Sequence, residues 1–167
     1  HPASFNLPEP GPKQSERKLS DRAVTLAERL ATAGWTTYGV TANPNLNANY
    51  GMAQGFDGYH DSDEKGFKRG RLAGTDVANQ ALAFLDARTE AQAERPFYLR
   101  MMMIDAHHPR TPPPALAAKW REPGLTATQV DYRATVSELD SALDQLDRGL
   151  RSRGYDEENT LFVFVTD

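Results

Sequence analysis

Three helix-type segments alternate with three short strand-type segments along the chain, and this alternation restricts the fold more than any other feature. Helical spacing of apolar residues occurs over 21–33, 76–88 and 127–153, and strand-type composition over 35–42, 97–105 and 160–166. A helix between two strands usually joins them as a parallel pair through a right-handed crossover. The order therefore predicts an α/β fold with a mainly parallel sheet flanked by helices.

The segment 127–153 has the clearest helical periodicity. Its large apolar residues recur at steps of three and four, which places on one helical face Val136, Leu139, Leu143, Leu146 and Leu150. Gly154 follows and is expected to end the helix. For the first helix, Ser20 or Asp21 is the expected N-cap, and Gly34 lies just past the expected end.

The strand-type segments differ in how buried we expect them to be. The run "FYLRMMMID" over 97–105 is almost continuously apolar, which is typical of a strand covered on both faces. The run "LFVFVTD" that ends at 167 is interpreted as a central strand for the same reason. Residues 1–20 are predicted to be an extended surface segment, and 43–66 a long loop with turns.

Composition excludes several classes of function. The 167 residues are 39% hydrophobic and 25% charged, which is ordinary for one globular domain. The net charge is −4 and no dense Lys/Arg cluster occurs, so we expect no nucleic-acid partner. No cysteine and no apolar run of about 18 residues occurs, which excludes a cysteine nucleophile within this chain and predicts no membrane span in this segment. P-loop, dinucleotide-binding and nucleophile-elbow patterns are also missing from the sequence.

Two of the predicted strands are followed by residues suited to an anionic ester. His107 and His108 come after the segment 97–105, and Asp167 comes after 160–166. Because the carboxyl ends of parallel strands share one edge of the sheet, we expect these residues to converge. Carboxylate oxygens suit a hard cation and a histidine can donate to an anion, so the pattern indicates a sulfate or phosphate ester site. Each residue alone also has an ordinary structural explanation, as a cap, a turn or a surface loop.

Four segments occur in the order found in one known family. They are "TLAERLATAGWTTYGVTANPNL", "YGMAQGFDGYHD", "RPFYLRMMMIDAHHPRTPP" and "YRATVSELDSALDQLDRGLRSRGYDEENTLFVFVTD". Together they resemble the sulfatases of the alkaline-phosphatase superfamily, whose strands end in D-x-H-x-P and in S/T-D-H-G or S/T-D-N-G. The family's nucleophile motif, C/S-x-P-x-R, has no match. Residues 1–167 are therefore expected to be one partial sulfatase-like catalytic domain, incomplete at both ends.

The resemblance implies that the full-length protein is a sulfuric ester hydrolase. His107 matches the D-x-H-x-P histidine, which implies a catalytic contact with the sulfuryl group or its leaving oxygen. Asp167 matches a metal-ligating aspartate, which implies a divalent cation, with Ca²⁺ the first choice. A formylglycine nucleophile is expected outside this chain. His108 and Arg110 are further candidates for substrate binding, and Asp105 is expected to fix the loop.

Two other classes of function stay open. One is a phosphate mono- or diester hydrolase or phosphotransferase on the same scaffold, because the G-K-W-H segment with which many arylsulfatases grip sulfate has no match. The other is a non-catalytic binding module that has lost the site. For the leading hypothesis the partner is a small-molecule or glycan sulfate ester, and this segment alone is expected to be inactive. The sequence decides neither the oligomeric state nor the compartment.

Overall fold

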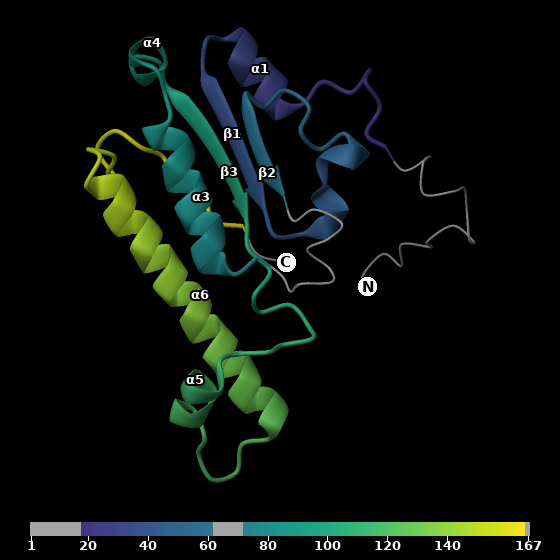
Figure 1. Ribbon diagram of the computed structural model, residues 1–167, viewed down its shortest axis with the longest axis vertical. Helices are drawn as coiled ribbons and strands as arrows, with labels where there is room; N and C mark the ends of the chain where they lie inside the picture. The colour runs from purple at the N-terminus through teal and green to yellow at the C-terminus, as the bar shows by residue number, and fades with distance from the viewer. Residues whose placement is uncertain (1–17, 62–71, 166–167) are drawn as a thin grey trace, which may run out of the picture.

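The computed structural model describes residues 18–61 and 72–165. Its elements are, in chain order, α1 (Leu26–Thr32), β1 (Thr36–Thr41), the 3-10 turns η2 (Pro44–Leu46) and η3 (Ala48–Tyr50), β2 (Gly58–Asp61), α3 (Gly74–Asp86), α4 (Glu90–Ala93), β3 (Phe97–Met102), α5 (Pro114–Lys119) and α6 (Ala127–Arg151). The three strands form one parallel sheet in the order β2–β1–β3, with helices beside it (Figure 1). The predicted α/β class is confirmed.

The strand β1 lies at the centre of the sheet. All six of its residues are buried, and it pairs with β2 from Tyr38 onward and with β3 along its whole length. Its threonines and Val40 are β-branched, which suits a pleated strand packed on both faces. The residues of β3 are only half-buried. The expectation of a strand covered on both faces is therefore wrong for β3, which forms an edge of the sheet within the described residues, whereas the central strand β1 is fully buried.

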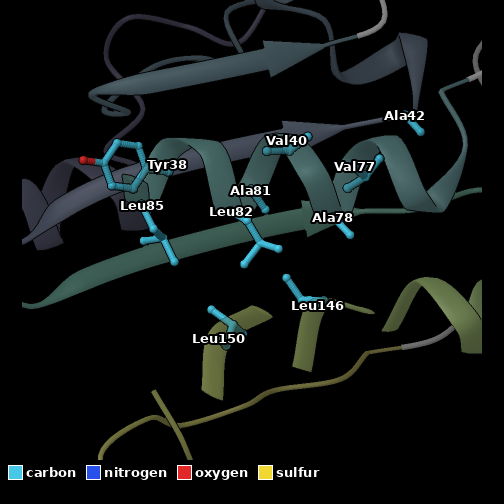
Figure 2. Packing of buried hydrophobic residues seen from close by; sticks show 10 residues of the cluster. All are labelled: Tyr38, Val40, Ala42, Val77, Ala78, Ala81, Leu82, Leu85, Leu146 and Leu150. Atoms are coloured by element: carbon cyan, nitrogen blue, oxygen red, sulfur yellow. The ribbon is translucent and has the colours of Figure 1, made fainter. Parts of the chain in front are cut away.

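The helix α3 covers one face of the sheet, and α6 packs along α3 (Figure 1). Figure 2 shows the resulting core, which joins β1, α3 and the second half of α6 in one cluster: Tyr38, Val40, Ala42, Val77, Ala78, Ala81, Leu82, Leu85, Leu146 and Leu150. Gly149 lets the two helices approach, because a Cβ there would lie 2.4 Å from Leu82 Cδ1. None of the helices within the described ranges is both long and apolar enough to cross a bilayer.

The buried face of α6 differs from the predicted one. Leu146 and Leu150 are buried as expected, but Val136 is 39% exposed. The face that packs inward recurs in steps of four and includes alanines: Val130, Ala134, Ala142, Leu146 and Leu150. A pattern of large residues misses alanine, although alanine allows the closest approach of two helices. The helix ends at Arg151, and Gly154 follows it with a φ of 81°.

Residues 161–165 do not form the predicted central strand. Leu161 and Val165 are each 88% exposed and Val163 is 72% exposed, although Phe162 packs against the core. A strand forms only where a neighbour exchanges backbone hydrogen bonds with it, and β3 pairs with β1 alone. The run is apolar, as a strand would be, but no strand within the described residues pairs with it.

Two further local predictions were wrong. The strand β2 lies inside the segment 43–66, which was expected to be a loop with turns, because a four-residue edge strand gives little periodic signal. The turns η2 and η3 agree with that expectation. The N-cap of α1 is Thr25 instead of Ser20 or Asp21. Thr25 Oγ1 accepts from Glu28 N at 3.1 Å, and Thr25 N donates to Glu28 Oε2 at 2.7 Å. This reciprocal pair of hydrogen bonds caps the helix at Thr25. The helix therefore begins later in the chain than its apolar pattern predicts.

Replacing Gly39 tests how closely the second face of β1 is packed. A Cβ at Gly39 would lie 2.5 Å from the Tyr59 ring, and Tyr59 OH donates to Leu46 O at 2.6 Å, which holds the ring in place. We expect Gly39→Ala to lower the free energy of unfolding by about 1–3 kcal/mol, the usual cost of overpacking. Urea denaturation of the full-length protein measures this difference.

The matched control for this prediction is the same substitution in a Tyr59→Leu background, which lacks the ring. We expect Gly39→Ala to cost less there, since the close contact is with the ring. Equal costs in the two backgrounds would show that the contact with Tyr59 does not limit the packing.

Candidate functional site

The carboxyl ends of the three parallel strands lie at one edge of the sheet (Figure 1). From β3 the chain leads directly into a loop that holds Asp105, His107, His108 and Arg110. The proline-rich sequence from Pro109 to Pro114 keeps this loop out of helix and sheet until α5 begins. The structure thus places these four residues at the edge where ligands of open parallel sheets bind.

Asp105 links the start of this loop to α3, the helix that covers one face of the sheet. Its Oδ1 accepts a hydrogen bond from Gly74 N at 2.7 Å, at the first residue of α3. A carboxylate at a helix N-terminus accepts a hydrogen bond from a backbone N–H that has no partner within the helix, and its negative charge interacts favourably with the helix dipole. His107 N donates to Ile104 O at 2.9 Å and closes the turn around Asp105. Asp105 therefore makes the contacts expected of a residue that fixes the loop.

The imidazole of His107 is exposed and is oriented by its own loop. Its Nδ1 lies 2.6 Å from the backbone oxygen of His108. A carbonyl oxygen can only accept, so this contact requires the proton on Nδ1. Proton transfer to a bound ester would then go through Nε2.

Arg110 is half-buried against α6. Its Nε donates to Ala106 O at 2.7 Å, and its Cζ lies 4.9 Å from the ring centroid of Tyr132. The backbone contact and the cation–π contact fix the guanidinium plane. The side chain therefore holds the loop against α6, and contact with a substrate stays a prediction for Arg110 as for His108.

The predicted metal ligand Asp167 lies outside the described residues, so its convergence with His107 stays a prediction. Within 18–61 and 72–165, no three or more His, Asp and Glu side chains form a cluster that could hold a metal ion. The described residues therefore do not by themselves make a metal shell. A small hollow on the sheet is lined by Gly39, Tyr59 and Arg100 among others, and includes no residue of the loop 105–110.

Two residues near the loop were missed by the sequence analysis. Gly74 supplies the N–H for Asp105, and Glu138 of α6 lies half-buried within the inward face of its helix. Burial, and then the negative charge of Asp105, raises the pKa of Glu138. The sequence did contain one indication that Glu138 lies on the inward face of the helix: it is four residues from Ala134 and four from Ala142.

Comparison with solved structures connects this architecture to known proteins. The lipoteichoic acid synthase LtaP from Listeria monocytogenes has a TM-score of 0.55 at 18% sequence identity, over 77% of this chain and 33% of that chain. A protein in the alkaline phosphatase superfamily from Vibrio parahaemolyticus has a TM-score of 0.53 at 18% identity, over 77% of this chain and 32% of that chain. No protein-family model matches the sequence, and no curated protein matches it significantly.

These comparisons establish the class of fold. The chain has a parallel α/β fold similar to that of these two structures, one of which is described as a protein in the alkaline phosphatase superfamily. It spans about a third of the length of the two similar structures.

Proposed function

We propose that the full-length protein is a sulfatase-type hydrolase, with this chain forming part of its catalytic domain. The observation that supports the proposal most strongly is the placement of the D-x-H-x-P segment. Its histidine, His107, follows a parallel strand at the carboxyl edge of the sheet, with Nδ1 held by the His108 carbonyl. A fold of the alkaline-phosphatase superfamily around this segment supports the same class of enzyme.

In the proposed reaction His107 is the general acid that donates a proton to the leaving group. The S–O bond to the alcohol breaks, and the departing alkoxide oxygen takes a proton from Nε2 of the imidazolium. The attacking nucleophile, a formylglycine hydrate by resemblance, lies outside this chain. Asp105 fixes the start of the loop, and Nδ1 stays bound to the carbonyl while Nε2 gives up its proton.

The remaining predicted roles belong to the same proposal. Asp167 ligates a divalent cation, Ca²⁺ by resemblance, together with carboxylates outside this chain. A cation held there would supply positive charge to the sulfate oxygens. Arg110 and His108 contact the anionic ester from the loop, where Arg110 has a fixed guanidinium plane. The expected substrate is a small-molecule or glycan sulfate ester.

Phosphate ester hydrolysis or phosphoryl transfer is the second candidate function. One similar structure is a lipoteichoic acid synthase and the other is described by the alkaline phosphatase superfamily, so neither description names a sulfatase. The same histidine would serve a phosphate ester through the same proton transfer.

The deciding experiment compares substrates on the purified full-length protein. Turnover of p-nitrophenyl sulfate, p-nitrophenyl phosphate and bis(p-nitrophenyl) phosphate is measured with and without added Ca²⁺, and the nucleophile is identified by peptide mass spectrometry. Preferred sulfate turnover with a formylglycine residue supports the first function. Preferred phosphate turnover with an unmodified Ser or Thr supports the second. Absence of both turnover and Ca²⁺ binding would favour the remaining candidate function, a non-catalytic binding module.

A further inference from the structure

Asn43 lies at the carboxyl edge of the sheet, directly after the central strand. The ladder between β1 and β3 pairs Thr41 with Met102, and it continues with a hydrogen bond from Ala42 N to Met102 O at 2.9 Å. Asn43 is the next residue of the chain and keeps an extended backbone, with a φ of −86° and a ψ of 114°. It therefore lies at the edge where ligands of open parallel sheets bind.

The loop that holds His107 begins at the same level of this edge. The register of β1 and β3, extended by two residues, corresponds to Asn43 beside Ile104. Neighbouring strands lie about 4.8 Å apart. Ile104 O accepts from His107 N at 2.9 Å, so the turn folds the backbone of His107 back onto the residue beside Asn43. The two strand ends thus bring Asn43 and the turn of His107 to one small region.

The side chain of Asn43 is held in one orientation. Its Oδ1 accepts from Asn45 N at 2.9 Å, which caps the turn η2, and its backbone N donates to Thr41 Oγ1 at 3.0 Å. A backbone N–H can only donate, so the amide atom that it contacts must be the oxygen. The two N–H bonds of Nδ2 therefore lie on the opposite side of the amide group from this contact.

The amide nitrogen of Asn43 has only a weak acceptor. Within the described residues, Nδ2 donates to the thioether sulfur of Met102 at 3.7 Å. A thioether accepts weakly, whereas an amide nitrogen can donate two hydrogen bonds. Met102 is the last residue of β3, so the contact directs Nδ2 toward the end of that strand. Asn43 is only half-buried, so a ligand at this edge can reach the donor.

We propose that Asn43 Nδ2 donates a hydrogen bond to a non-bridging oxygen of the bound sulfate or phosphate ester. The inference rests on the proposed function, because it takes the ester site to lie at the carboxyl edge beside His107. Anionic oxygens are strong acceptors, and a donor that is already held in place by its own carbonyl needs no rearrangement when the anion binds. Asn43 is then a substrate-binding residue that orients the anion, while His107 acts on the leaving oxygen.

The test separates the donor from the cap. Asn43→Asp keeps an oxygen for Asn45 N and replaces the N–H donor with a second oxygen. Asn43→Ser adds no charge, and its hydroxyl oxygen can still cap η2 but has no donor at the position of Nδ2. Calorimetry measures the binding of inorganic sulfate and inorganic phosphate to the full-length protein. We expect both variants to bind the preferred anion about tenfold or more weakly, as loss of one hydrogen bond to a charged group produces, and to unfold within about 2 °C of the unaltered protein.

Asn45→Asp is the matched control for added charge, because Asn45 is exposed and lies two residues from Asn43. It should weaken anion binding by less than about threefold at 0.15 M salt, where screening reduces the effect of an exposed charge. Unchanged anion affinity in both Asn43 variants would overturn the inference and leave the proposed function in place. A loss in Asn43→Asp alone, equal to that in Asn45→Asp, would be an effect of charge and would also overturn it. If the unaltered protein binds neither anion, the proposed function and the inference are both wrong.

Discussion

His107→Ala in the full-length protein is expected to lower kcat on an aryl sulfate by about 10²-fold or more, the range of general acid–base effects. The imidazole lies at the carboxyl edge of the sheet, with its Nδ1 held by the His108 carbonyl at 2.6 Å. Removing it eliminates the Nε2 proton that the departing oxygen takes up. The loss should be largest for phenols of high pKa, because good leaving groups depart without protonation. Steady-state kinetics over a series of substituted phenyl sulfates measures this trend.

His108→Ala is the matched control, since His108 is the adjacent exposed histidine of the same loop. Its backbone carbonyl, which holds His107, is retained in the variant. We expect a change in kcat of less than about tenfold, below the usual range for a proton-transferring group. An equal loss in both variants, or a His107→Ala loss that does not depend on the leaving group, would contradict the assignment of general acid.

Asp167→Ala is expected to abolish metal-dependent activity and to lower the bound metal content of the full-length protein. The prediction rests on the match of Asp167 to the metal-ligating aspartate and on its position after the apolar run 161–165. A carboxylate is a preferred ligand for Ca²⁺, and losing one from a shell of several weakens binding strongly. Elemental analysis after gel filtration, together with turnover at increasing Ca²⁺, measures the effect.

Asp140→Ala is the control for this second prediction, because Asp140 is an exposed aspartate on α6. It should retain both metal and activity. Partial rescue of Asp167→Ala by high Ca²⁺ concentrations would agree with a ligand role. Normal metal content in Asp167→Ala with lost activity would instead assign the aspartate to another function.

The sequence alone determined the elements whose signals are local. The steps of three and four predicted a helix from 127, and α6 begins at Ala127 with Thr126 as N-cap. Predicted segments 35–42 and 97–105 contain β1 and β3, and 76–88 overlaps α3. The parallel class followed from their order, which also placed His107 after a strand at the carboxyl edge. These properties depend on neighbouring residues in the chain, so periodicity and composition carry them.

Only the tertiary structure decided the features that need a distant partner. The run 161–165 has strand composition but pairs with no strand among the described residues, and β2 became a strand because β1 lies beside it. Likewise, Gly74 and Asp105 are 31 positions apart in the sequence, and only folding brings Asp105 Oδ1 within 2.7 Å of Gly74 N. Backbone pairing and the loss of hydration depend on what folding places opposite a residue, and a linear pattern does not contain that information.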